Sequence, residues 1–213
     1  MIILHGVSAS PYVRKVITVL AMKQLPFEQK QQMPFARDAE FNKISPLGKI
    51  PALQDGDITL CDSTVICEYL EDTHPEINVY PTNHADKAKA RWIEELAGSR
   101  VTELATGIFF QRFMRPMVFK QDPDEALVEK IIDKDLPPIL DHLETLVPAT
   151  DFLFGELQLA DISLVSPFIN ASYANYTVDT QHWPQLSAFI DRVKTHPIME
   201  PILEAEAKIM GFA

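Results

Sequence analysis

Two short polar segments of this chain each stand directly before a predicted helix. Ser10 precedes Pro11, and the pair Asp62-Ser63 precedes an apolar helical pattern. The start of a helix carries unpaired N–H donors and a partial positive charge. Serine and aspartate can cap such a helix while the remaining donors, the hydroxyl and the carboxylate face a ligand. We therefore take both segments as candidate sites for the polar groups of a bound molecule.

The segment before Asp62 predicts a β-hairpin. Two extended runs, residues 52–54 and 58–60, are joined by an Asp55-Gly56-Asp57 turn, and an Asp-Gly turn between extended runs is typical of a hairpin. Pro51 has no N–H for a strand ladder, so we expect it at the first residue of an edge strand. The second strand of the hairpin then leads into the helix that Asp62-Ser63 begins.

The first third of the chain alternates predicted strands and helices. Val13, Val16, Ile17 and Leu20 follow the spacing of one buried helical face, and Pro11 suits its first turn. Strands are expected at 2–5 and 26–30, a short helix around 37–43, and the hairpin and a further helix after it. This order predicts a thioredoxin-like α/β domain with a sheet of mixed direction and helices on both faces.

The rest of the chain reads as helical after a segment rich in turn formers, residues 73–83. Helical patterns cover approximately 85–114, 127–146 with a kink at Pro137-Pro138, 162–174, a segment from Pro184, and 198–210. We therefore expect a thioredoxin-like domain over 1–76, a linker over 77–84, and an all-helical C-terminal bundle domain over 85–213.

Composition excludes several classes of partner. The chain has 213 residues, 46% of them hydrophobic, and a formal net charge of −11, which disfavours nucleic acid and anionic membrane surfaces. No apolar run approaches the roughly 18 residues of a membrane span, and no signal peptide pattern precedes the first strand. The spacing of Cys61 and Cys67 fits neither a zinc site nor a redox pair, so we expect no metal, reduced thiols and a cytoplasmic protein.

Four motifs together resemble those of the glutathione S-transferases, and the resemblance covers the whole chain. They are Ser10-Pro11-Tyr12-Val13-Arg14, the stretch from Asn42 to Pro51, Asp62-Ser63, and Leu159-Ala160-Asp161-Ile162. The resemblance implies a serine-type, bacterial-type transferase. Its co-substrate would be glutathione, it would need no further cofactor, and it would form a homodimer.

The resemblance also implies how glutathione would be held. The backbone of Ile50, before a cis Pro51, would pair with the glutathione cysteinyl backbone, while Asp62 and Ser63 would hold the γ-glutamyl end. Lys49 is a candidate for the glycyl carboxylate. The alternatives stay open: Asp62-Ser63 can be an N-cap only, and Lys49 can be an ordinary solvated lysine.

The thiol of glutathione must lose its proton to react, and a free cysteine thiol has a pKa of about 8.5. Ser10 suits this task, because a hydroxyl at a helix start adds a hydrogen bond to the helix field. Ser8 is the competitor, since some serine-type members place the hydroxyl earlier in this loop. Tyr12 fits less well.

The second substrate is expected in an apolar pocket between the domains. Phe109, Phe113 and Arg112 are candidate lining residues near the end of the long helix, although aromatics at such spacing also serve as core or dimer contacts. Asp161 is expected to be structural. Family members usually carry Ser or Thr three residues before it, where this chain has Gln158, so Asp161 must bond nearby N–H groups itself.

The function that the resemblance implies is attack of the glutathione thiolate on a small, largely apolar electrophile. Two alternatives remain. One is a non-catalytic interaction protein of the starvation-protein type, and the other is a glutathione-dependent reductase of thiols or peroxides.

Overall fold

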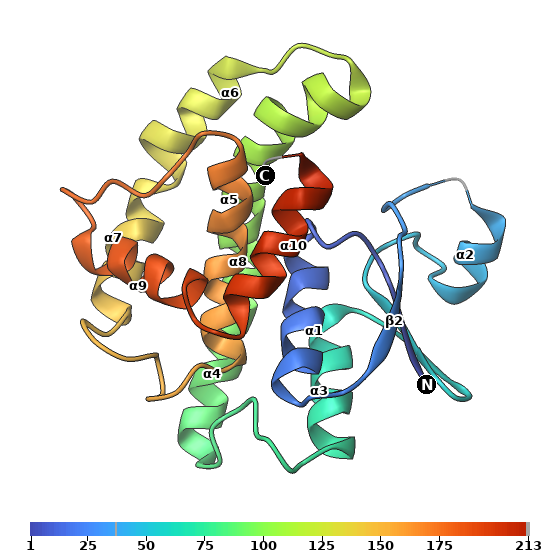
Figure 1. The fold of residues 1–213 in the computed structure, drawn as a ribbon. Helices are drawn as coiled ribbons and strands as arrows, with labels where there is room; N and C mark the ends of the chain where they lie inside the picture. Colours follow the sequence, from blue (N-terminus) through green and yellow to red (C-terminus); the bar gives the residue numbers. More distant parts are fainter. Residues whose placement is uncertain (37, 212–213) are drawn as a thin grey trace. The chain divides into compact units, whose positions relative to one another are not determined.

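The computed structural model describes residues 1–36 and 38–211, and the chain forms two compact units. The first unit comprises Met1–Tyr80 together with the chain from Pro197 onward, and the second comprises Pro81–His196. Figure 1 follows the chain through both units.

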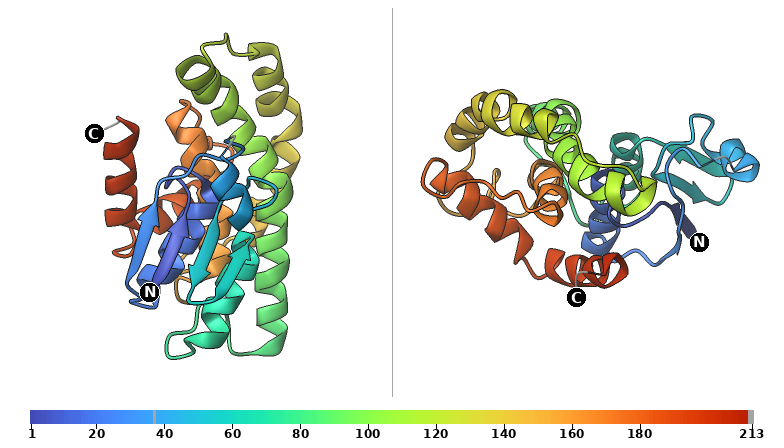
Figure 2. Two further views of the ribbon diagram at one scale, coloured as in Figure 1. Left: turned by 90° about the vertical axis from the view of Figure 1, so that its right-hand side faces the viewer. Right: turned by 90° about the horizontal axis from the view of Figure 1, so that it is seen from above.

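The first unit is built on a four-stranded sheet. Its elements are β1 (Ile2–His5), α1 (Pro11–Met22), β2 (Phe27–Lys30), α2 (Ala39–Ile44), β3 (Ala52–Asp55), β4 (Ile58–Cys61), α3 (Ser63–Thr73) and α10 (Met199–Met210). The strand order is β2-β1-β3-β4, with β1 parallel to β2 and antiparallel to β3. Helices α1 and α3 pack together on one face of the sheet, and α2 lies on the other side (Figure 2). The predicted thioredoxin-like domain is confirmed.

The two helix starts that the sequence singles out are also confirmed. Helix α1 begins at Pro11 with Ser10 as its N-cap, and α3 begins at Ser63 with Asp62 as its N-cap. The apolar stripe predicted for α1 is buried, because Val13, Val16, Ile17 and Leu20 are each at most 8% exposed. Burial of such a stripe, more than helix propensity, holds a helix of this length in place.

Pro51 corrects one expectation about the sheet. It was expected at the first residue of an edge strand, but β3 is an interior strand between β1 and β4. Pro51 lies directly before β3, whose ladder begins with Ala52 paired to His5 and Cys61. The missing N–H of Pro51 therefore falls outside the ladder, and the rule that confines proline to edge strands does not apply to it.

Helix α2 is shorter than the helix expected around 37–43. It begins at Ala39, where Asp38 Oδ1 accepts hydrogen bonds from the N–H groups of Glu40 and Phe41 at 3.0 and 3.1 Å. Arg37, at the expected start, lies outside the described residues.

The segment after α3 is tied to the first unit by a buried lysine. Lys23 Nζ donates to Glu71 Oε2 at 2.7 Å and to the carbonyls of His74 and Ile77 at 2.8 and 2.6 Å. Glu71 Oε2 also accepts from the Val79 N–H at 3.1 Å. These bonds hold much of the segment expected as a linker, and the first unit extends to Tyr80.

Helix α10 belongs to the first unit as well, whereas the sequence placed residues 198–210 in the helical domain. Two contacts join it to α1. Thr18 Oγ1 lies 3.4 Å from Met199 Sδ, and Arg14 forms an ion pair with Glu206. Both ends of the chain therefore contribute to one compact unit.

The second unit is helical and forms around α8. Its elements are α4 (His84–Leu96), η1 (Ala97–Val101), α5 (Thr102–Phe109), η2 (Phe110–Phe119), α6 (Glu125–Lys130), η3 (Ile131–Asp135), α7 (Pro137–Leu146), α8 (Leu159–Tyr173) and α9 (Pro184–Lys194), where η marks a π-helical segment. Helix α8 is buried along nearly its whole length and packs against α4, α5 and α9. Pro137-Pro138 begins α7 directly after η3, so the helix expected over 127–146 is divided into separate segments there.

Across residues 1–36 and 38–211, no helix has both the length and the apolar character needed to cross a membrane.

Candidate glutathione site

Three chain segments meet at one end of the sheet in the first unit. His5 pairs with Ala52, and Ala52 pairs with Cys61, so the last residue of β1, the first of β3 and the last of β4 lie in one row. The loop after β1, the residues before β3 and the residues after β4 must therefore leave the sheet at the same end. We call this group the sheet-end site. It consists of Ser8, Ser10, Ile50, Pro51, Asp62 and Ser63.

The starts of α1 and α3 both belong to this end. The two helices pack side by side, and Lys15 Nζ donates to Thr64 Oγ1 at 3.0 Å, which joins their first turns. Their N-terminal N–H groups and partial positive charges consequently act on neighbouring regions. Such a pair of helix starts suits a ligand with two separated anionic groups.

Gly6 allows α1 to start close to Ile50. Its φ is +151°, and a Cβ added to it would lie 2.5 Å from Val13 Cγ2 and 3.4 Å from Ile50 Cβ. Any side chain at this position would collide with α1, so only glycine permits this approach. A glycine directly after a strand is a usable sequence signal of such close backbone approach.

The hydroxyl of Ser10 accepts a hydrogen bond but donates none within the described residues. Its Oγ accepts a long hydrogen bond of 3.5 Å from the Val13 N–H, as the N-cap of α1. The side chain is half-buried, and among the described residues its hydroxyl donates to no partner. A hydroxyl supplies one donor. The Ser10 donor is therefore free to meet an anion at the start of α1.

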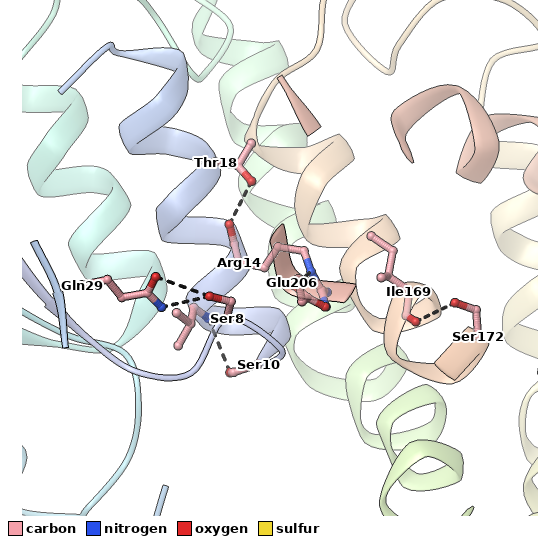
Figure 3. A network of polar contacts seen from close by, with 9 residues as sticks. Ser8, Ser10, Arg14, Thr18, Gln29, Ile169, Ser172 and Glu206 are labelled. Atoms are coloured by element: carbon pink, nitrogen blue, oxygen red, sulfur yellow. Dashed lines mark hydrogen bonds and ion pairs between the residues drawn. The ribbon is translucent and has the colours of Figure 1, made fainter. Parts of the chain in front are cut away.

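Ser8 is in a different situation, because Gln29 of β2 engages its hydroxyl (Figure 3). Gln29 Nε2 donates to Ser8 Oγ at 3.0 Å, and Ser8 Oγ lies 3.4 Å from Gln29 Oε1. The Gln29 amide also donates to the Gly6 carbonyl at 2.9 Å. Ser8 is only 8% exposed. Its hydroxyl thus contributes to the loop, and Gln29 is a site-shaping residue that the sequence analysis missed.

The peptide bond between Ile50 and Pro51 is cis, as the resemblance implies. Ile50 is 8% exposed, and Pro51 is also buried. Ser45 Oγ donates to the Lys49 carbonyl at 2.8 Å and supports the chain just before this bond. The Lys49 side chain is exposed, and its ammonium forms no hydrogen bond or ion pair with the residues that the structure describes.

At the start of α3, Asp62 caps the helix and Ser63 does not. Asp62 Oδ1 accepts hydrogen bonds from the N–H groups of Thr64 and Val65 at 2.9 and 3.4 Å, so the aspartate caps the helix. Ser63 is 5% exposed, and within residues 1–36 and 38–211 its hydroxyl has no hydrogen-bond partner. The cap is therefore supplied by Asp62 alone, which leaves the Ser63 hydroxyl available to a ligand.

Comparison with known proteins identifies the family. Residues 4–78 match the family described as "Glutathione S-transferase, N-terminal domain", and residues 109–205 match "Glutathione S-transferase, C-terminal domain". The chain belongs to the glutathione S-transferase family.

Relatives within the family cover nearly the whole chain. It is 30% identical to a glutathione S-transferase of Triticum aestivum, over 94% of this chain and 92% of the relative. A solved glutathione S-transferase structure from Rhodospirillum rubrum matches with a TM-score of 0.84 and 26% identity, over 95% of this chain and 92% of the other. The chain is also 24% identical to "FtsZ-localized protein A" of Caulobacter vibrioides, over 94% of this chain and 90% of that protein.

The residues expected to line the co-substrate pocket all lie in the second unit. Phe109 and Phe113 stack with ring centroids 5.0 Å apart, and Phe109 lies 6.5 Å from Tyr173. Arg112 forms an ion pair with Glu125, with Nη2 and Oε2 2.9 Å apart. Arg112 is therefore partly neutralised within its own unit, and a pocket that joins these residues to the sheet-end site stays a prediction.

Asp161 has the structural role expected of it in this family. Its carboxylate is fully buried and accepts hydrogen bonds from the N–H groups of Leu153 and Gln158, both at 2.8 Å. Gln158 does not replace the usual hydroxyl, because its Oε1 is buried without a partner among the described residues. Burial raises the pKa of Asp161 to about 6, although the backbone N–H bonds act in the opposite direction.

Among the described residues, no group of three or more His, Cys, Asp or Glu side chains is arranged to hold a metal ion.

Proposed function

We propose that this protein is a glutathione transferase whose Ser10 hydroxyl stabilises the thiolate of bound glutathione. The observation that carries this proposal is the unshared donor of Ser10 at the start of α1, on the same end of the sheet as Ile50-Pro51 and Asp62-Ser63. Family membership supports glutathione as the ligand.

Each polar group of glutathione has a proposed partner in the sheet-end site or next to it. The γ-glutamyl carboxylate accepts from the Ser63 hydroxyl and the first N–H groups of α3, and the adjacent ammonium faces the Asp62 carboxylate. The Ile50 backbone pairs with the cysteinyl backbone. Lys49, whose ammonium is exposed, takes the glycyl carboxylate. The thiol then lies at the start of α1, near Ser10.

The energy needed for thiol activation is within reach of these groups. Lowering a thiol pKa by about 2 units needs about 2.7 kcal/mol of extra thiolate stabilisation. A charge-assisted hydrogen bond contributes about 1.5–3 kcal/mol, and a helix start typically contributes about 0.3–1 kcal/mol. The combined range of one serine donor and the field of α1 therefore includes the value required.

The reaction that follows is nucleophilic. The thiolate sulfur forms a bond to an electrophilic carbon, and the electron pair displaced from that carbon leaves with a leaving group or moves onto a conjugated acceptor. Phe113, which is half-buried and stacks on the buried ring of Phe109, offers an apolar contact for a flat organic co-substrate. We propose no metal and no cofactor besides glutathione.

We propose that the protein is a cytoplasmic homodimer. Both cysteines, Cys61 and Cys67, are free thiols, which agrees with a reducing compartment. Exposed apolar side chains on the first unit, Ile58 at 45% and Val65 at 46%, are candidates for the dimer contact. Neither nucleic acid nor a membrane is proposed as a partner.

Titration of bound glutathione tests the assignment of Ser10. Thiolate absorbance is recorded against pH for the wild type, Ser10→Gly and Ser8→Ala, each saturated with glutathione. Glycine caps a helix nearly as well as serine but lacks the hydroxyl, so Ser10→Gly isolates the donor. We expect a higher thiol pKa in Ser10→Gly and no change in Ser8→Ala. A shift confined to Ser8→Ala moves the role to Ser8.

A second candidate function is a glutathione-binding interaction protein without turnover. The relative described as "FtsZ-localized protein A" favours keeping this candidate. Retention on immobilised glutathione tests binding, and a panel of chloroarene, epoxide, disulfide and peroxide substrates then tests turnover. Activity with the chloroarene or epoxide supports the transferase, whereas activity confined to the disulfide or peroxide supports a reductase. Binding with no turnover on the whole panel supports the interaction protein.

A further inference from the structure

A buried ion pair joins the last helix of the first unit to its first helix. Arg14 of α1 and Glu206 of α10 have side chains with 0% exposure, and they stand 192 residues apart in the chain. Arg14 Nε donates to Glu206 Oε2 at 2.9 Å, and Nη2 donates to Oε1 at 2.5 Å. This two-point geometry fixes the orientation of both side chains (Figure 3). Removal of one partner from such a pair leaves an uncompensated buried charge.

Arg14 is also connected directly to Ser10. The Arg14 N–H donates to the Ser10 carbonyl at 2.9 Å, which is the hydrogen bond that closes the first turn of α1. One turn further on, Thr18 Oγ1 donates to the Arg14 carbonyl at 2.9 Å and lies 3.4 Å from Met199 Sδ of α10. Helix α10 thus contacts α1 at two successive turns, and the contact through Arg14 lies next to the turn that carries Ser10.

The cap bond of Ser10 is weak by comparison. Its length of 3.5 Å from Val13 N to Ser10 Oγ exceeds the usual range of about 2.7–3.2 Å. The bond alone therefore does little to fix the hydroxyl. A better-fixed neighbour is Arg14, whose side chain is held by Glu206 and whose backbone N–H holds the Ser10 carbonyl.

We propose that Glu206 is a positioning residue for thiol activation. By holding Arg14, it fixes the first turn of α1 and with it the direction in which the Ser10 hydroxyl meets the sulfur of glutathione. This inference rests on the proposed function, because it concerns the same Ser10 donor. A displacement of about 1 Å in a reacting geometry can cost on the order of 100-fold in rate, so a contact that α10 makes with α1 can control the chemistry at the start of α1.

The direction in which the thiol pKa of bound glutathione changes distinguishes a positioning role of Glu206 from a direct effect of its charge. When Glu206 is made neutral, Arg14 keeps a buried positive charge that Glu206 no longer balances. That charge by itself favours a thiolate nearby and lowers the thiol pKa. Loss of the Ser10 donor geometry acts in the opposite direction and raises it. A rise in the thiol pKa is therefore specific to positioning.

The experiment compares Glu206→Gln with Glu204→Gln in the full chain. Glu204 makes the matched control, because it is exposed on the same helix and undergoes the same chemical change. Thiolate absorbance of bound glutathione is titrated against pH, and the affinity for S-methylglutathione is measured by calorimetry. For Glu206→Gln we expect the thiol pKa to rise by about one unit, which is about tenfold less thiolate below the pKa. Affinity for S-methylglutathione should stay within twofold, and Glu204→Gln should match the wild type.

An unchanged or lowered thiol pKa in Glu206→Gln overturns the proposal. If Glu206→Gln does not fold, Arg14→Lys decides the question, because lysine keeps the charge but loses the two-point geometry. The thiol pKa of glutathione bound to Arg14→Lys should rise as well. If it equals the value measured with the wild type, the proposal is overturned. The wild type is the reference for the proposed function: if it fails to bind glutathione or to lower its thiol pKa, the proposed function fails. A normal wild type with an unaltered Glu206→Gln refutes only the role of Glu206.

Discussion

Gln29 donates its side-chain amide to Ser8 Oγ at 3.0 Å and to the Gly6 carbonyl at 2.9 Å, so a residue of β2 holds the loop that leads into α1. This relationship separates the two serines of the loop. Gln29 engages the Ser8 hydroxyl, whereas the Ser10 hydroxyl donates to no partner among the described residues.

Gln29→Leu should lower the free energy of unfolding and change the pKa of the bound thiol less than Ser10→Gly does. Leucine leaves the Gly6 carbonyl and the Ser8 hydroxyl without their donor, and a buried polar group left unpaired costs about 1–3 kcal/mol. Urea denaturation measures the loss of stability, and the titration of bound glutathione gives its thiol pKa. If that pKa changes as much as in Ser10→Gly, then Ser8 or its loop takes part in activating the thiol.

Ser63→Ala should weaken glutathione binding more than it slows the chemical step. Its hydroxyl is unpaired within the described residues, and the cap of α3 comes from Asp62. The loss of one charge-assisted hydrogen bond to the γ-glutamyl carboxylate costs about 1.5–3 kcal/mol of binding free energy. Calorimetric titration with glutathione measures it. Equal dissociation constants for wild type and variant would remove Ser63 from the site.

Asp62→Asn should keep the helix cap and lose the charge. Asparagine caps a helix as well as aspartate, so thermal unfolding should be close to wild type. Affinity for glutathione should fall, because the substrate ammonium loses its carboxylate partner. The matched ligand is glutathione without its amino group. Wild type and Asp62→Asn should bind this ligand with equal dissociation constants. An equal loss for both ligands would show that Asp62 does not contact the ammonium.

Asp161→Asn should destabilise the second unit, and more so in mild acid than at neutral pH. The carboxylate accepts from two backbone N–H groups at 2.8 Å, whereas the asparagine amide group can accept at only one atom. Because burial raises the pKa of Asp161 to about 6, the folded protein favours its protonated form. The contribution of this shift to the free energy of unfolding is fully present at a pH below about 4, the pKa of Asp161 in the unfolded chain. It is lost as the pH rises through about 6, its pKa in the folded protein.

Urea denaturation of the wild type and Asp161→Asn between pH 4 and 7 checks this direction. The difference in unfolding free energy should shrink as the pH rises. A difference that grows with pH would mean that the backbone N–H groups lower the pKa of Asp161 below its unfolded value.

The protein should sediment as a dimer, at twice the 24.1 kDa of one chain. Val65→Lys on the exposed side of α3 should shift it toward the monomer, because a charge within an apolar contact is costly. Sedimentation equilibrium at micromolar concentration measures both. Glu68→Lys introduces the same lysine on α3 at a position that is not apolar. This control variant should remain a dimer. A wild type of 24.1 kDa would contradict the prediction.

Local patterns of the sequence predict the elements of this fold well. The Asp55-Gly56 turn, the N-cap residues Ser10 and Asp62, and the apolar stripe of α1 all depend on neighbours within a few residues. The structure confirms each of them. The interior place of β3 was missed for a physical reason. Strand order depends on pairing between distant segments, and a proline just outside a strand gives the same local signal as one at its first residue.

Contacts between distant segments lie beyond such patterns. Nothing around Glu206 indicates that it pairs with Arg14, because a helix shows which of its residues are apolar but not which helix it will meet. Gln29 is similar, since its amide reaches Ser8 only once β1 and β2 are paired. The sequence analysis therefore found the residues of the sheet-end site that touch its helix starts and missed those that hold them in place.

The pairing of Arg14 with Glu206 also sets an order of events during synthesis. The two residues are 192 positions apart, and at about 5–20 residues per second the ribosome needs roughly 10–40 s to pass from one to the other. Throughout that interval the guanidinium of the nascent chain has no Glu206 to meet. All of Pro81–His196 emerges in the meantime. Synthesis of the first unit therefore begins before that of the second unit and is completed after it.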